Sequence, residues 1–205
     1  MSAGIIEVRG LCNRFGDFSV HENLDLDVRT GEIIGVVGGS GSGKSVLMRS
    51  ILALNRPQAG RIRLLGKDAL SHDPASRAFI ERNTGVLFQN AALFSSLTVM
   101  ENVMVPLKEH STLPEDVMTG LDPISAAGFD RLILTIQKAL GLTVFLITHD
   151  LDTLYTICDR VAVIADRRVL VTAPIEEVAA YDHPWIREYF HGPRGRAART
   201  VTEMT

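Results

Sequence analysis

The sequence contains little cysteine and no excess of basic charge, and each shortage excludes a class of protein. Its two cysteines, Cys12 and Cys158, lie far apart and form no C-x-x-C pair, which excludes a disulfide-stapled scaffold and favours free thiols in a reducing compartment. Lysine and arginine number 21 against 24 acidic residues, so the net charge is −3. Without a global basic field we expect no nucleic-acid partner, and a phosphate ligand must be held locally.

Long hydrophobic runs are also missing. The longest are of the kind of IIGVVGG at 33–39, far below the roughly 18 residues that a membrane-spanning helix needs. The opening MSAGIIEVRG lacks the basic and then apolar segments of a signal peptide. We therefore expect a cytoplasmic chain with no transmembrane segment. Its 205 residues, 46% of them hydrophobic, suffice for a single domain over 1–205 with a substantial core.

Short β-branched runs alternate with amphipathic segments, which is the pattern of an α/β fold with a parallel sheet covered by helices. Strands are expected over 5–9, 24–28, 32–37, 61–65, 85–88, 143–148, 160–165 and 168–172. Helices are expected over 45–54 and 124–140, the second with an apolar stripe of Phe129, Leu132, Ile133, Ile136 and Leu140. A third helix carries Leu151, Leu154, Tyr155 and Cys158, and we expect Cys158 to be a core residue.

The sharpest motif is a glycine-rich loop between an apolar strand and an amphipathic helix. It matches G-x-x-x-x-G-K-[ST] with Gly38, Gly39, Ser40, Gly41, Ser42, Gly43, Lys44 and Ser45. Glycines let successive backbone N–H groups turn toward phosphate oxygens, and the helix N-terminus adds partial positive charge. Lys44 can then reach the β- and γ-phosphates, and the Ser45 hydroxyl can ligate Mg²⁺. The strand–loop–helix context disfavours the alternative, a flexible Gly/Ser turn.

Polar residues follow two other expected strands. Gln89 ends GVLFQ, and His149 follows TVFLIT. Because ligands of open parallel sheets bind beyond the carboxyl ends of the strands, we expect both side chains to join Lys44 and Ser45 in one crevice. There they would position Mg²⁺, water and the γ-phosphate. Taken alone, Gln89 would be an ordinary loop amide and His149 a neighbour of the N-capping Asp150.

With these residues identified, the sequence resembles the nucleotide-binding subunit of an ABC transporter. The resemblance makes GGSGSGKS the Walker A motif, Gln89 the Q-loop glutamine, and His149 the switch histidine. LDP at 121–123 resembles the D-loop, although N-capping alone would explain Asp122. Phe15 matches the aromatic A-loop position that stacks on adenine, with a packed core position as the alternative. The resemblance implies ATP and Mg²⁺ as cofactors, and a membrane permease and a second nucleotide-binding subunit as partners.

Within this family the chain is most similar to the Mla-type ATPases, which energise phospholipid or solvent movement through the bacterial envelope. The matching stretches include VLFQNAALFSSLTVMENVMVPL and TVFLITHDLDTLYTICDRVAVIAD. The resemblance implies lipid transport and a peripheral location on the inner face of the cell membrane. It would dock the permease on the apolar Ala92, Leu93, Phe94 and Leu97, for which a core-facing helix start is the alternative.

One block that the resemblance implies is missing. Between Gln89 and Leu121 there is no LSGG-type signature loop and no apolar strand ending in Asp-Glu. The chain therefore reads as though the helical subdomain, signature loop and Walker B strand were cut out near 118–119. Other carboxylates do not replace them, since Asp166 matches a later family strand, and Glu101 and Glu115 suit a solvated surface.

The missing block leaves three functional hypotheses. The first is an ATPase subunit that couples ATP to a permease, and the second is a nucleotide-binding remnant that is hydrolytically inactive or regulatory. The third is an unrelated soluble P-loop kinase, for which the sequence shows no acceptor-substrate pocket. Since a general base contributes about 10²- to 10⁴-fold, we expect hydrolysis by this chain alone to stay at background.

The C-terminal segment suggests a further contact. PWIREYF places Trp185 and Tyr189 four residues apart on a helix, which suits docking on a neighbour or on its own domain. The tail over 192–205, with Arg194, Arg196 and Arg199, is expected to be a mobile basic segment, with contact to lipid headgroups as the alternative.

Overall fold

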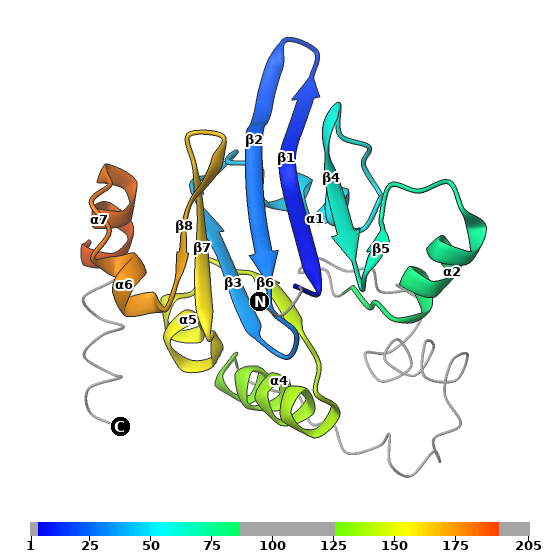
Figure 1. Ribbon diagram of the computed structural model, residues 1–205. Coiled ribbons are helices and arrows are strands. Elements are labelled where there is room, and N and C mark those ends of the chain that lie inside the picture. Colours follow the sequence, from blue (N-terminus) through cyan, green and yellow to red (C-terminus); the bar gives the residue numbers. More distant parts are fainter. Residues whose placement is uncertain (1–3, 87–125, 193–205) are drawn as a thin grey trace, which may run out of the picture.

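The computed structural model describes residues 4–86 and 126–192, which form two four-stranded sheets with helices around them (Figure 1). The first sheet is antiparallel and has the order β2-β1-β4-β5. Its strands are β1 (Ile6–Phe15), β2 (Phe18–Val28), β4 (Ala59–Leu64) and β5 (Lys67–Asp68). Both β1 and β2 extend well past the expected 5–9 and 24–28, because they continue as a hairpin whose inward positions include polar residues.

The second sheet positions the nucleotide motifs and has the order β6-β3-β7-β8. Its strands are β3 (Ile33–Gly38), β6 (Val144–Ile147), β7 (Arg160–Ala165) and β8 (Arg168–Ala173). β3 runs parallel to β6 and β7 and is buried along its whole length, as expected for a strand covered on both faces. β7 and β8 are joined by a hairpin turn at Asp166 and Arg167, both with positive φ.

Helices pack on both faces of this second sheet, and among the described residues two hydrophobic clusters result. The described helices are α1 (Lys44–Ile51), α2 (Pro74–Arg82), α4 (Ala126–Leu140), α5 (Leu151–Ile157), α6 (Ile175–Ala179) and α7 (Pro184–His191), of which α2 lies beside β5 of the first sheet. One cluster joins β3 and α1 to the antiparallel sheet through Ile34 and Leu47. The other joins β3 and β7 to α5, α6 and α7 through Val37 and Phe190. No helix of the described part is long and apolar enough to cross a membrane.

Most of the expected elements are confirmed, with boundaries shifted by a few residues. Both cysteines are free, and Cys158 ends α5, where it packs against the second cluster and burial raises its pKa to about 12. The first half of the expected strand over 85–88 is not confirmed. Gly85 and Val86 lie outside any strand. Residues 87 and 88 lie outside the described ranges.

The edge of the second sheet is open at β6. Within the described ranges β6 pairs only with β3, and all four of its residues are merely half-buried. The nearby apolar stripe of α4 is also incompletely covered, since Ile136 and Leu140 are 39% and 69% exposed. An apolar parallel strand is ordinarily paired on both sides and covered on both faces. The open edge is in line with the expected loss of the Walker B strand.

Candidate nucleotide-binding site

The glycine-rich loop links the end of β3 to the start of α1, and two of its glycines are required by close packing. A Cβ on Gly38 would lie 2.4 Å from the carbonyl oxygen of Ile164 on the neighbouring β7. Gly43 has a φ of 95°, and a Cβ there would lie 2.4 Å from Nε2 of His21. Only glycine fits both positions without strain, so the loop backbone packs tightly against β7 and β2.

The Lys44 side chain folds back over the loop backbone. Its Nζ donates hydrogen bonds to the carbonyl oxygens of Gly38 at 2.7 Å and Gly39 at 2.8 Å, and burial lowers its pKa. The N-terminus of α1 has no side-chain cap and no acidic residue in its first turn, while Ser45 in that turn is exposed. An uncapped helix start with a lysine beside it favours an anion through its free N–H groups and the helix dipole.

The strand register brings His149 to the same edge of the sheet. Val36 of β3 pairs with Ile147 of β6 in a parallel ladder, so Gly38 and His149 each follow that pair by two residues. Adjacent strands lie about 4.8 Å apart, and His149 is exposed there. Asp150, the next residue, N-caps α5 by accepting a hydrogen bond from the Asp152 N–H at 3.0 Å. The register of β6 with β3 therefore supports the expected proximity of His149 to the loop. The catalytic role of His149 stays a prediction.

Phe15 lies at the end of the β1–β2 hairpin, opposite Phe18. The two rings are 52% and 64% exposed, so the alternative of a packed core phenylalanine is wrong. Their neighbours Arg14 and Ser19 line a hollow of about 310 Å³ that extends to His21. The exposed Phe15 ring is available to stack on a planar base.

The other candidates lie outside the described residues. These are the proposed metal ligand Gln89, the D-loop residue Asp122, the permease patch of Ala92, Leu93, Phe94 and Leu97, the acidic Glu101 and Glu115, and the arginines of the tail. Their roles stay predictions.

A buried polar network next to the loop escaped the sequence analysis. His21 is fully buried, its Nδ1 lies 3.0 Å from Oδ1 of Asn13, and the Asn13 amide donates to Ser50 of α1 at 3.2 Å. Among the described residues its Nε2 has no hydrogen-bond partner, and burial lowers its pKa to about 4. The network fastens the β1–β2 hairpin to the helix that follows the loop.

The alternation of apolar residues in β2 concealed this network. Leu24, Leu26 and Val28 are buried, so simple alternation places residue 21 on the exposed face. The ladder is irregular between the pairs Leu11–Leu24 and Asn13–His21, and Asn23 there has a φ of 50°. Such an irregularity breaks strict alternation, and both Val20 and His21 are buried beyond it. The one signal in the sequence was Asn23, two residues after His21, because asparagine tolerates a positive φ.

Comparison with known families agrees with this geometry. The sequence description of the family "ABC transporter" matches residues 21–170. The chain belongs to the ABC transporter family. It is similar to solved ATP-binding cassettes, at a TM-score of 0.71 to cbiO1 from Clostridium perfringens, part of the ABC transporter complex cbiONQ, with 21% identity over 98% of this chain and 99% of that one. The TM-score is 0.69 to MJ0796, determined as a dimer bound to ADP and Pi, with 18% identity over 83% and 98% of the two chains.

Curated relatives are ATP-binding proteins of several transporters. The methionine import protein MetN of Cupriavidus necator is 29% identical over 85% of this chain, and the chain spans 66% of its length. The intermembrane phospholipid transport protein MlaF of Haemophilus influenzae is 27% identical over 87% of both chains. These two alignments extend over 228 and 229 residues, which exceeds the 205 of the whole chain. The relatives therefore contain residues within the matched span that this chain lacks, which supports the expected internal deletion.

Proposed function

We propose that this ABC transporter subunit binds ATP with Mg²⁺ at the loop Gly38 to Ser45. The observation that carries the proposal is the Lys44 ammonium held at 2.7 and 2.8 Å from two loop carbonyls beside an uncapped helix N-terminus. A phosphate chain can draw Lys44 from these neutral carbonyls to a stronger, charged partner. Ser45 would ligate Mg²⁺, which usually takes one or two protein ligands and keeps several waters.

Other residues have proposed roles that follow the family pattern. Gln89 would supply a second oxygen ligand to Mg²⁺, and His149 would contact the γ-phosphate from the end of β6. Phe15 would stack on adenine at the hairpin, and Asp122 would lie near the partner subunit. The exposure of Phe15 and the register of β6 with β3 support two of these assignments.

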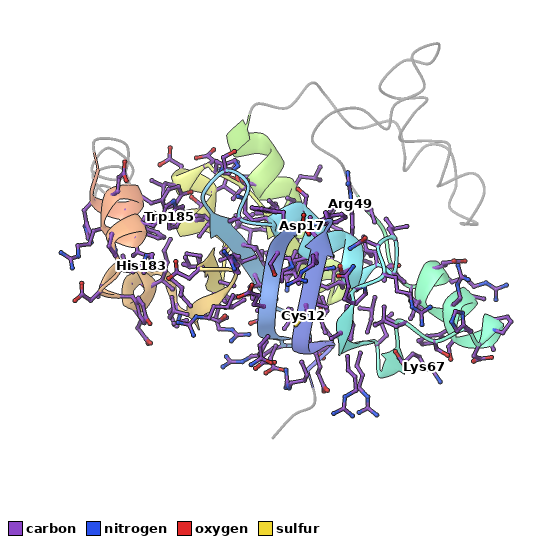
Figure 2. The ribbon with its side chains drawn as sticks, turned by 90° about the horizontal axis from the view of Figure 1, so that it is seen from above. Cys12, Asp17, Arg49, Lys67, His183 and Trp185 are labelled. Carbon is purple, nitrogen blue, oxygen red and sulfur yellow. The ribbon has the colours of Figure 1, made fainter. Side chains whose placement is uncertain are left out.

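Isothermal titration calorimetry with Mg-ADP tests the binding proposal. Replacing Lys44 with Ala should weaken binding at least tenfold, because a charge-assisted contact to phosphate is worth about 1.5–3 kcal/mol. The matched control is Lys67→Ala, which removes a lysine on β5, at the edge of the first sheet, whereas the loop follows β3 of the second sheet. Figure 2 shows Lys67 on the side of the molecule away from Trp185. Equal affinities for Lys44→Ala and the parent would overturn the proposal.

Hydrolysis by the isolated chain should stay at background. Asp150, beside His149, is engaged at the N-terminus of α5, and Asp166 lies in the β7–β8 turn, on the side of β3 opposite to β6. We therefore expect neither carboxylate to activate water beside His149. Because catalytic groups that act together are not additive, the remaining groups should contribute little without a base.

Phosphate release by the purified chain, with and without His149→Ala, tests this expectation. Both proteins should release phosphate at the rate of a protein-free control. A robust rate that disappears in His149→Ala would show that a carboxylate has taken over the missing role. Asp150→Asn and Asp166→Asn would then identify it.

The partners that we propose are a membrane permease and a second nucleotide-binding subunit, with phospholipid or a related lipid as the transported substrate. The similarity to MlaF over 87% of both chains supports a lipid, while the relative MetN is a methionine importer. Proteoliposomes containing the chain, its permease and an intact second nucleotide-binding subunit should move a fluorescent phospholipid in the presence of ATP. Uptake of labelled methionine without lipid movement would contradict the lipid assignment.

A further inference from the structure

The C-terminal helix α7 contacts the nucleotide-binding loop directly. Nε1 of Trp185 lies 3.4 Å, and its Cδ1 3.8 Å, from the position that a Cβ of Gly39 would occupy. The carbonyl of Gly39 in turn accepts a hydrogen bond from Lys44 at 2.8 Å. The edge of the indole therefore lies beside Gly39, and the carbonyl of Gly39 is hydrogen-bonded to the lysine that is proposed to bind phosphate. Residues 39 and 185 are far apart in sequence, so only the tertiary fold creates this contact.

Trp185 is held in place from behind by a second aromatic ring. Tyr189 stacks on it with ring centroids 4.7 Å apart and an angle of 15°, and Phe190 meets Tyr189 edge-on at 5.0 Å. Phe190 and Ile186 are fully buried in the second hydrophobic cluster. Aromatic pairs of this geometry contribute about 0.5–1.5 kcal/mol beyond their buried area, so the position of the indole is well defined.

The second ring of the pair is enclosed by protein at its hydroxyl end. The Tyr189 hydroxyl is buried and has no hydrogen-bond partner among the described residues. Burial raises the pKa of Tyr189 to about 12, and the nearby charge of Asp150 acts in the same direction.

The helix itself is fastened at both ends. At its start, Nε2 of His183 lies 3.4 Å from the Asp166 carboxylate in the β7–β8 turn. At its end, a ring nitrogen of His191 lies 2.8 Å from the carbonyl oxygen of Ala179 in α6. Figure 2 shows Trp185 and His183 together on the side of the molecule formed by α6 and α7. Contacts at both ends therefore hold the helix that carries the indole.

We propose that Trp185, stacked on Tyr189, is a positioning residue of the nucleotide site that packs beside the P-loop at Gly39. The proposal rests on nucleotide binding at the P-loop. Nucleotide that draws Lys44 from the Gly39 carbonyl changes the surroundings of the indole, so α7 senses occupancy of the site.

Intrinsic fluorescence provides a direct readout, because Trp185 is the only tryptophan of the chain. Addition of Mg-ADP should shift or quench its emission with the same dissociation constant that calorimetry gives. Lys44→Ala should lose this response in parallel with its loss of binding. If calorimetry detects binding but the emission does not change, the inference fails and the proposed function stands. If calorimetry detects no binding, both fail.

Substitutions separate positioning from general stabilisation. Trp185→Ala should raise the dissociation constant of Mg-ADP by about tenfold, from the size of an aromatic contact, while Trp185→Phe keeps the stack and should restore most of the affinity. Ile80→Ala is the control for general destabilisation, since it removes a buried side chain of α2, which packs beside β5 of the other sheet. It should lower the melting temperature without changing the dissociation constant. Equal losses of affinity in Trp185→Ala and Ile80→Ala would reduce Trp185 to a structural role.

Discussion

Acidification should destabilise this protein through one buried imidazole, that of His21. The ring is fully buried beside Gly43, with one nitrogen on Asn13 and the other without a hydrogen-bond partner in the described part of the chain. Burial lowers its pKa from 6.5 to about 4, although the backbone of Gly43 acts in the opposite direction. The folded protein therefore keeps His21 neutral, whereas the unfolded chain protonates it below about pH 6.5.

The size of the effect follows from proton linkage. Because the folded state binds fewer protons than the unfolded state, the stabilisation is complete above pH 6.5 and is lost as the pH falls toward 4. Each pKa unit corresponds to about 1.36 kcal/mol, so the free energy of unfolding should fall by about 3 kcal/mol at pH 4. Since domains are stable by only about 5–15 kcal/mol, this loss is large.

Urea unfolding at pH 7 and pH 4 measures the effect in the parent and in His21→Phe. The variant lacks a titrating ring at this position, while the carboxylates of both proteins titrate alike, so the difference between the two pH dependences isolates His21. The parent should lose about 3 kcal/mol more than the variant between the two pH values. Parallel pH dependences would refute the argument, because they would mean that the buried imidazole accepts a proton at no cost.

Two further perturbations test how the site is held. Arg160 forms a bidentate ion pair with Glu32 at 2.7 and 2.8 Å, with side chains only 11% and 7% exposed. Arg160→Met should lower the free energy of unfolding by about 3–5 kcal/mol, because it leaves the Glu32 carboxylate buried and uncompensated; a loss below about 1 kcal/mol in urea unfolding would contradict this. Gly43→Ala should abolish Mg-ADP binding in calorimetry, since φ is 95° and the new Cβ would meet His21 at 2.4 Å. The control Gly66→Ala, also at positive φ but with open space around it, should bind normally, and unchanged binding by Gly43→Ala would contradict the assigned loop geometry.

Local sequence determined the nucleotide-binding loop and the strands around it. The buried run of β3, the glycines and the amphipathic α1 are contiguous, so each residue's conformation depends mainly on its near neighbours. The same holds for β7 and β8, whose bounds match expectation closely. The position of His149 at the sheet edge followed from one further rule, that parallel strands end on the same side.

The tertiary structure alone decided what supports the loop. His21 became buried through an irregularity in the β1–β2 ladder, which shifts the facing of residues that strict alternation places in solvent. Phe15 is exposed because it lies at the hairpin end, although a phenylalanine side chain suits a core position equally well. Trp185 reached Gly39 only because α7 packs on the second cluster. A pattern of period 3.6 identifies the apolar face of a helix and not the partner that covers it, so contacts between distant segments have to be read from the folded chain.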